Sequence, residues 1–216
     1  MKKLIPAVVT VLAVAGCTHL VDGTPKMAAP GYHPPTAAAP TTGPVALPGP
    51  PNCPEVPFTV LATQSPDEPT LSIPTVLGWQ PSNERNSPLI RGAFVAPGLR
   101  ANDFTPNAVV TLADVTKNSD TPEKAIQTET QGLDTKFAID SLTTGTRCGF
   151  PYETVDYKYE GRPATTLIVA AKDDQARVWV STVEMQTTEP NRPEYVKAKQ
   201  LIIGAYRVTI RGGAAR

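Results

Sequence analysis

The chain has 216 residues, and its 20 basic and 20 acidic side chains give a formal net charge of zero. A nucleic-acid-binding domain normally presents a strongly basic face, so this balance does not support a nucleic-acid partner. Residues 53–210 suffice for one domain with its own hydrophobic core and are too few for two domains of ordinary size.

The chain begins with an export signal. Lys2 and Lys3 precede an apolar run from Leu4 to Val14, which is too short to span a bilayer. The next residues complete the tetrapeptide Val14-Ala15-Gly16-Cys17, which resembles the lipobox of bacterial lipoproteins. The resemblance implies that residues 1–16 are removed and that Cys17 is acylated, for example with palmitate. The chain is then anchored to the outer face of the cell membrane, in the cell envelope. The alternative is an ordinary secretory signal without an anchor.

Residues 17–52 differ in composition from the rest of the chain. Proline alternates with small residues there, as in Pro48-Gly49-Pro50-Pro51, and large apolar side chains are few. Such a segment cannot bury enough apolar surface to offset the entropy of ordering it. We expect a disordered stalk, with an ordered arm packed on the domain as the alternative. The domain follows over residues 53–210, and we expect residues 211–216 to be a frayed tail.

Cys53 and Cys148 are the two cysteines left if Cys17 is acylated. An even pair outside the cytoplasm normally forms a disulfide, which here closes a loop of about 95 residues and pins the start of the domain. The alternative is a reactive thiol, which requires a basic or histidine neighbour that the nearby sequence lacks.

The first half of the domain reads as strands followed by a helix. A first strand is expected around 71–73 with a turn up to Trp79, and further strands at 91–95 and 108–115. Thr121 then supplies a helix N-cap and Pro122 a favourable first position. Ile126, Leu133 and Phe137 lie on one face, which predicts a helix over 122–136.

The second half alternates strands with short turns. Strands are expected at 153–159, 164–171 and 176–186, and because the links are short, neighbouring strands must be antiparallel. A second helix is expected from the Asn191-Arg192-Pro193-Glu194 start, and Val208 and Ile210 close the domain. The fold class is therefore α+β, an antiparallel β-sheet of five to seven strands packed with helices.

One stretch of the sequence, from Ser72 to Trp79, has a pattern seen in a known protein family. The Ser72-Ile73-Pro74 to Gly78-Trp79 start, together with the lipobox, the stalk and the order of elements, resembles the mycobacterial LpqN/LpqT-type lipoproteins. The resemblance implies an α/β/α sandwich of the Mog1/PsbP-like fold and a location in the cell envelope. It also implies the binding, rather than the chemical conversion, of an envelope lipid or glycolipid. It supplies no catalytic residues and no cofactor.

Catalytic motifs are scarce in the sequence. The two histidines, His19 and His33, both precede the domain, which excludes Ser-His-Asp and Cys-His nucleophile systems from it. There is no zinc spacing, nucleotide loop or Gly-x-Ser-x-Gly elbow, so we expect no metal and a non-catalytic protein. The adjacent Asp173-Asp174 pair leaves a carboxylate-based glycan hydrolase, or a weak calcium site, as alternatives to turn chemistry.

The sequence offers more candidate residues for a binding site than for a catalytic site. Pairing of the last strands is expected to bring aromatic rings with polar handles together near arginines, an arrangement that suits sugars or lipid head groups. The candidate ligand-binding residues are Tyr152, Tyr157, Tyr159, Arg162 and Trp179, with Arg147 beside them. The site is expected between the sheet and a helix, with apolar walls. Two alternatives remain open, namely that the rings belong to the sheet core, or that a sheet face docks another envelope protein.

Overall fold

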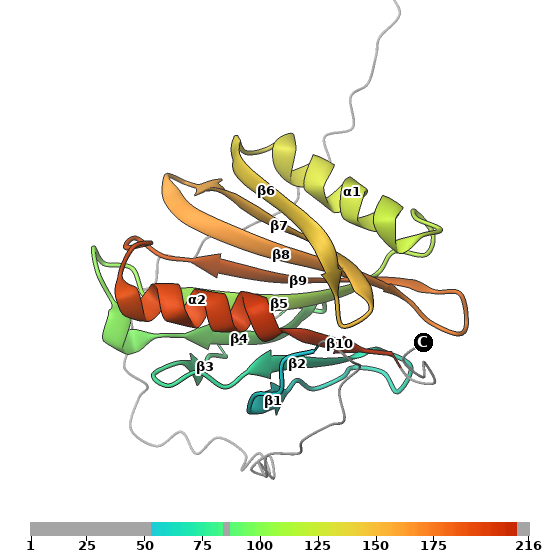
Figure 1. Cartoon of the computed structure of the whole chain (residues 1–216), viewed down its shortest axis with the longest axis horizontal. Coiled ribbons are helices and arrows are strands. Elements are labelled where there is room, and N and C mark those ends of the chain that lie inside the picture. Colours follow the sequence, from blue (N-terminus) through green and yellow to red (C-terminus); the bar gives the residue numbers. More distant parts are fainter. Residues whose placement is uncertain (1–52, 84–86, 211–216) are drawn as a thin grey trace, which may run out of the picture. The chain divides into compact units, whose positions relative to one another are not determined.

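The computed structural model describes residues 53–83 and 87–210. These residues form ten strands, two α-helices and one short 3-10 helix, Pro97–Leu99 (Figure 1). The signal peptide, the acylation of Cys17, the stalk and the tail, predicted over 1–16, 17–52 and 211–216, lie outside the described residues. Among the described residues, no helix is long and apolar enough to cross a membrane.

The larger sheet has seven strands, all antiparallel to their neighbours, and confirms the predicted α+β class. Its order across the sheet is β3 (Gln80–Pro81), β4 (Ile90–Val95), β5 (Asn107–Asp114), β9 (Val178–Gln186), β8 (Arg162–Lys172), β7 (Phe150–Tyr159) and β6 (Ile139–Arg147). The predicted meander of three strands is present as β7, β8 and β9.

A second, three-stranded sheet was not foreseen as a separate unit. It consists of β1 (Phe58–Val60), β2 (Thr70–Pro74) and β10 (Arg207–Thr209), with β2 in the centre. The expected first strand is therefore the second, because β1 precedes it. Strand β10 joins the two ends of the domain, since Val208 pairs with Leu71 across 137 residues of sequence (208 − 71).

Helix α1 spans Pro122–Asp134 and begins as the sequence predicts. The Thr121 side chain accepts a hydrogen bond from the Lys124 amide, and Pro122 and Glu123 occupy the first turn. The helix ends two residues before the expected boundary. Phe137 nevertheless packs in the same apolar cluster as Ile126, because its amide turns back to the Leu133 carbonyl. Helix α2 spans Pro193–Ala205.

Strand β8 divides the apolar core into two. Leu167, Val169 and Ala171 pack with residues of α2 and the small sheet, while the alternate residues Ile168 and Ala170 pack with α1. This follows from the period of two in a β-strand. A helix thus lies on each face of the large sheet, as the sandwich prediction requires.

Strand β6 was missed by the sequence analysis. It is an outer strand of the large sheet, and residues 141–146 are all exposed. An edge strand with solvent on both sides has no need for alternating apolar residues. The segment Ser-Leu-Thr-Thr-Gly-Thr therefore gives no periodic signal, and its identity as a strand comes from pairing with β7.

The predicted disulfide between Cys53 and Cys148 is present, with Cα atoms 5.0 Å apart. It joins the first described residue to the β6–β7 turn. Cys148 and Gly149 both have positive φ angles, 50° and 85°, as the central residues of a tight hairpin require. Close by in sequence, the Pro54 carbonyl accepts a hydrogen bond from the Arg207 side chain at 3.0 Å. The start of the domain is thus fastened at two points.

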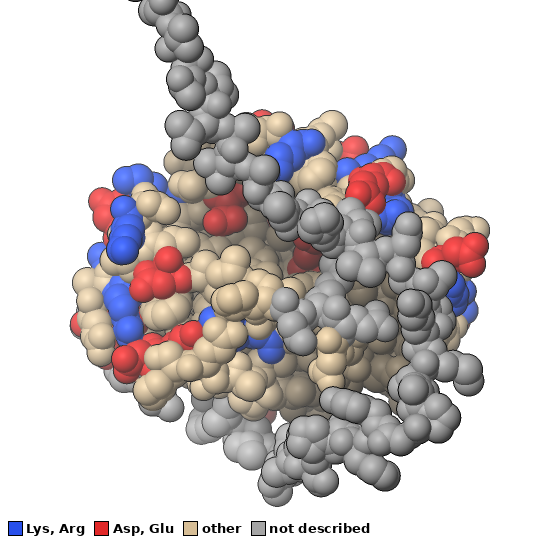
Figure 2. Space-filling view, turned by 180° about the vertical axis from the view of Figure 1, so that it is seen from behind, with Lys and Arg blue, Asp and Glu red and all other residues tan. Residues whose placement is uncertain are grey.

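The described surface has no single dominant charge on the face seen in Figure 2. Lys and Arg side chains alternate there with Asp and Glu side chains around the rim, and the remainder is uncharged. This mixture agrees with the overall balance of charge in the chain.

Removal of the disulfide tests its contribution to stability. The double variant Cys53→Ser/Cys148→Ser should lose about 2–4 kcal/mol of unfolding free energy, because the unfolded chain is no longer cross-linked. Urea denaturation of the mature chain measures this loss. A reductant should bring the wild type to the value of the variant and leave the variant itself unchanged. Equal midpoints for oxidised and reduced wild type contradict the prediction.

Candidate functional site

The four candidate aromatic residues do not form one cluster. Tyr157 and Tyr159 belong to the core under α1, whereas Trp179 and Tyr152 pack in the core under α2. The expectation that the four rings lie close together is therefore wrong. The physical reason is strand alternation, because Tyr152 and Tyr157 are five positions apart on β7 and so point to opposite faces.

The Tyr157 ring is a core element. It is 2% exposed, stacks on Phe137 with ring centroids 5.0 Å apart, and its hydroxyl shares a 3.1 Å hydrogen bond with Thr166. Burial, together with the charge of Glu184, raises the pKa of Tyr157 well above its usual range. A hydroxyl that is buried and already paired is not available to a ligand.

Arg147, packed on the Tyr152 ring, joins the β6–β7 hairpin to helix α2. The Arg147 guanidinium lies 4.5 Å from the centre of the Tyr152 ring and donates a hydrogen bond to the Ile203 carbonyl in α2. On the other strand, a Cβ atom at Gly145 would lie 2.9 Å from the ring, so glycine is needed for this approach. These contacts account for Arg147 and Tyr152 as structural residues.

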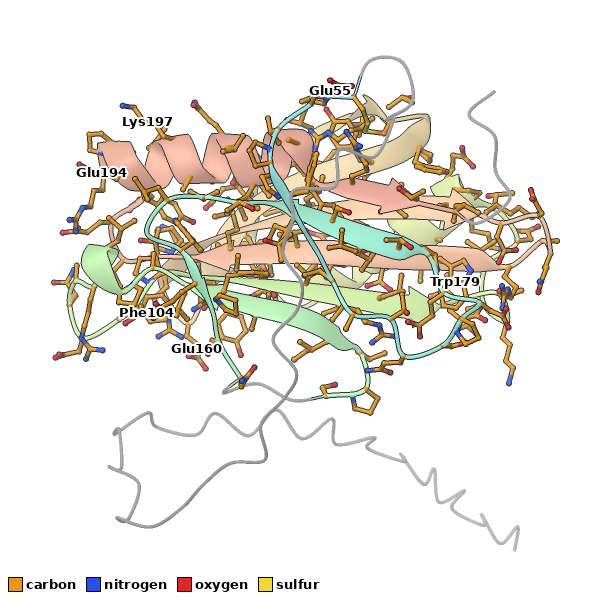
Figure 3. All side chains as sticks on the ribbon, turned by 90° about the horizontal axis from the view of Figure 1, so that it is seen from below. Glu55, Phe104, Glu160, Trp179, Glu194 and Lys197 are labelled. Atoms are coloured by element: carbon orange, nitrogen blue, oxygen red, sulfur yellow. A yellow bond between two sulfur atoms is a disulfide. The ribbon has the colours of Figure 1, made fainter. Side chains whose placement is uncertain are left out.

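Arg162 and Trp179 lie far apart. The Arg162 guanidinium packs 5.1 Å from the centre of the Phe104 ring and pairs with Glu160 at 2.6 Å. Figure 3 shows Phe104 and Glu160 near one end of the domain and Trp179 at the other. An arginine next to the Trp179 ring does exist, but it is Arg177, at 5.2 Å.

The Asp173 carboxylate organises the β8–β9 hairpin. One oxygen accepts hydrogen bonds from the amides of Gln175 and Arg177, both at 2.9 Å. The other oxygen accepts from the Arg177 Nε at 2.7 Å and from the Trp179 Nε1 at 3.0 Å. All four bonds hold the turn in place, which supports the turn interpretation of the Asp173-Asp174 pair. Neither Asp173 oxygen is left free to act as the base of a hydrolase.

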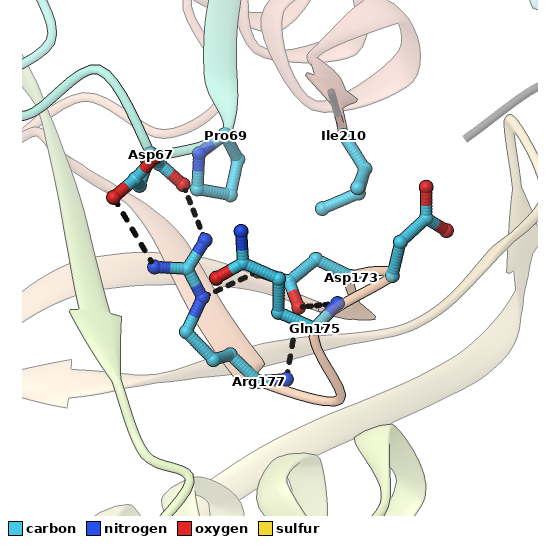
Figure 4. A pocket seen from close by; sticks show the side chains of 7 residues that line it. Asp67, Pro69, Asp173, Gln175, Arg177 and Ile210 are labelled. Atoms are coloured by element: carbon cyan, nitrogen blue, oxygen red, sulfur yellow. Dashed lines mark hydrogen bonds and ion pairs between the residues drawn. The ribbon is translucent and has the colours of Figure 1, made fainter. Parts of the chain in front are cut away.

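A polar pocket of about 310 Å³ lies beside this hairpin (Figure 4). Three of its charged groups already pair, since the Arg177 guanidinium contacts both Asp67 and Asp173. The lining residues are Asp67, Pro69, Asp173, Asp174, Gln175, Arg177 and Ile210.

A second pocket, of about 130 Å³, lies where the two sheets and α2 meet. Every residue that lines it is uncharged, and most are apolar. They are Thr59, Ile73, Pro74, Thr75, Val76, Trp79, Pro81, Phe94 and Ile202. The Trp79 ring lies 6.5 Å from the ring of Tyr195 on α2, which ties the β2–β3 connection to the helix. We call this the apolar pocket.

The five predicted ligand-binding residues line neither pocket. The apolar pocket is instead lined by residues of the Ser72-Ile73-Pro74 to Gly78-Trp79 stretch. An apolar run that ends at a Gly-Trp turn was the signal in the sequence. Its partners Thr59, Phe94 and Ile202 come from distant segments, and their convergence could not be read from spacing.

The family model described as "Probable lipoprotein LpqN" matches residues 54–209, most of the chain. The chain belongs to this family. The predicted resemblance is thereby confirmed, and the match covers nearly the whole described domain. No curated protein is similar enough in sequence to match.

Two solved structures resemble the domain. The LpqN protein of Mycobacterium tuberculosis, described as involved in cell envelope biogenesis, is 19% identical with a TM-score of 0.55. The alignment covers 70% of this chain and 90% of that protein, which shows a shared fold. The Ran-binding protein Mog1p of Saccharomyces cerevisiae is 11% identical with a TM-score of 0.43, over 71% of this chain and 96% of Mog1p.

The pH dependence of stability tests the role of Asp173. Burial by itself raises the pKa of this carboxyl, but hydrogen bonds from Trp179 and Arg177 outweigh it and hold the pKa below the usual 3.8. A lowered pKa stabilises the folded state above the unfolded value, and this stabilisation is lost as the pH falls through the folded pKa.

The variant Asp173→Asn should therefore show a smaller drop in unfolding free energy between pH 6 and pH 3, about one to two units either side of the unfolded pKa, than the wild type. Urea denaturation at the two values measures the difference. Asp174→Asn, at the exposed neighbouring position, serves as the control. An unchanged drop in Asp173→Asn contradicts the assignment.

Proposed function

We propose that this protein is a lipid-anchored module of the cell envelope that binds the apolar end of an envelope lipid or glycolipid without catalysing a reaction. The observation that carries the proposal is the apolar pocket between the two sheets and α2. Membership of the lipoprotein family and the involvement of the M. tuberculosis relative in cell envelope biogenesis support a location in the cell envelope.

The chemistry of the pocket suits a hydrocarbon chain. Its walls contain no charged group, and its polar atoms include the Thr59 and Thr75 hydroxyls, which lie 3.3 Å from each other. Each methylene group moved from water into such a site contributes about 0.8 kcal/mol. The volume of 130 Å³ is below the roughly 300–1,000 Å³ of pockets that enclose a whole small molecule. The pocket therefore accepts the end of an acyl chain and leaves the head group outside.

A binding role also agrees with the state of the catalytic candidates that the sequence offered. Neither histidine of the chain lies in the domain. The best carboxylate candidate, Asp173, has both oxygens engaged in the hairpin. General acid–base chemistry needs a group that can exchange a proton with the substrate, and these residues do not supply it.

A second candidate function is docking of another envelope protein, and strand β6 favours it. Among the described residues, this outer strand is nine residues long with no charged side chain from Ser141 to Thr146. The opposite edge, β3, has two residues and ends in Pro81, which cannot donate a ladder hydrogen bond. An extended segment of a partner can add to an edge such as β6 by main-chain hydrogen bonds.

Thermal shift with envelope lipids tests the binding proposal. The chain from Thr18 to Arg216, exported without its acyl group, is heated with lipid fractions from its own host. A ligand at 100 times its Kd that binds only the folded state adds about 2.7 kcal/mol, or about 5–10 °C in Tm for a domain of this size.

The variant Val76→Phe places a larger side chain at the pocket wall and should abolish the shift, because the ring takes the volume of the acyl end. Val60→Phe, at a 49% exposed position outside the pocket, is the matched control and should retain it. If no fraction shifts the wild type, the lipid proposal is wrong and docking through β6 remains.

Membrane fractionation tests the anchor. Acylation requires the Cys17 sulfur, so Cys17→Ala should leave the chain soluble or uncleaved and without radioactive palmitate. The wild type should partition with membranes and carry the label, because two or more acyl chains bind a bilayer stably. A Cys17→Ala chain that still partitions and takes up label shows that the anchor is elsewhere.

A further inference from the structure

The connection between β2 and β3 exposes an apolar tip. From Thr70 to Pro81 the sequence has no charged residue. Leu77 is fully exposed, at 101%, and its neighbours Val76 and Trp79 line the apolar pocket. Isolated exposed apolar residues are common on proteins. This leucine differs because it lies in the chain between Val76 and Trp79, two residues that line a pocket.

The turn is built to hold Leu77 at its tip. The Trp79 amide donates a hydrogen bond to the Val76 carbonyl at 3.1 Å, and Gly78 has a φ of 83°. A hydrogen bond from the fourth residue to the first, with glycine in third place, is typical of a type II turn. The Thr75 amide donates to the Pro57 carbonyl at 2.9 Å. The amides of Thr75 and Trp79, on either side of the tip, are thus satisfied within the protein, which lowers the cost of placing them near lipid.

The loop lies beside the point where the domain continues toward Cys17. Phe58 pairs with Pro74, and the Thr75–Pro57 hydrogen bond extends this pairing to the loop itself. Five residues earlier in the chain, Cys53 is fixed to Cys148. Only residues 17–52 separate this fixed point from the predicted acylated cysteine. The chain between the domain and a lipid surface that holds the acyl chains is thus at most these residues.

We propose that the loop Thr75–Trp79 rests on the lipid surface to which Cys17 is anchored, with Leu77 inserted among the acyl chains. This inference depends on the proposed function and gives the pocket a route of entry. An acyl end then passes from the membrane along Leu77 and Val76 into the apolar pocket without crossing water. The anchor favours the contact because it holds the loop at a high effective concentration near the membrane.

Tryptophan fluorescence of the acylated full-length mature chain tests the contact. The chain is reconstituted in vesicles of phosphatidylglycerol and phosphatidylethanolamine that carry a nitroxide near the top of the acyl chains. The protein has two tryptophans, Trp79 beside the loop and Trp179, which is 7% exposed in the β8–β9 hairpin. We expect the nitroxide to quench the wild-type emission, and we expect Trp79→Phe to lose this quenching.

Leu77→Ser should also lose most of the quenching, although Trp79 is still present, because the tip no longer inserts. Leu77 is fully exposed, so the change removes no core contact. Leu142→Ser on β6, at a 45% exposed position, is the matched control and should be quenched like the wild type. Equal quenching of wild type and Leu77→Ser, or of wild type and Trp79→Phe, overturns the proposal.

The result is separable from the test of the proposed function. Quenching that depends on Leu77, without any lipid-induced thermal shift, supports membrane contact and rejects the pocket as a lipid site. A thermal shift that Val76→Phe abolishes, with no quenching in vesicles, supports the pocket and rejects membrane contact by this loop.

Discussion

The burial of strand β8 on both faces is the constraint on which the rest of the domain depends. Eight consecutive residues from Ala164 to Ala171 are buried. Because side chains alternate along a strand, every second residue needs a cover on the opposite face. Helix α1 covers one face, and α2 with the small sheet covers the other. If either cover were lost, about half of these buried side chains, most of them apolar, would be exposed to water.

Several elements together cover the face of the large sheet on which α2 lies, and the apolar pocket lies between them. Helix α1 closes its side as a single element, whereas the opposite side combines a helix with a three-stranded sheet made from both ends of the domain. A pocket remains where the two sheets and α2 meet. Ile73 from the small sheet, Phe94 from the large sheet and Ile202 from α2 border the space that is left. The binding proposal thus follows from how the second layer is built.

The disulfide and Arg207 fix the chain where this composite layer begins. Strand β1 pairs only with β2 and covers three residues, so by itself it holds the start of the domain weakly. The bond from Cys53 to Cys148 and the hydrogen bond from Arg207 to Pro54 fasten the segment before it. Arg207 also packs 4.6 Å from the centre of the Phe58 ring. The position of the loop Thr75–Trp79 relative to Cys53, where the described domain begins, is therefore defined by covalent and polar contacts as well as by packing.

Local patterns predicted both helices and the long buried strands of this protein from the sequence alone. The Thr121 cap with Pro122, the buried run of β8 and the short turns on either side of it are properties of neighbouring residues, and the structure contains each of them. The lipoprotein resemblance likewise identified the family. Strand β6 was not predicted because an exposed edge strand needs no alternation of apolar and polar residues. Tyr152 and Tyr157 were wrongly grouped because they lie five positions apart on one strand, and alternation places such residues on opposite faces. The apolar pocket was decided by tertiary structure only, because Thr59, Ile73, Phe94 and Ile202 are distant in the chain and meet through packing of the two sheets and α2.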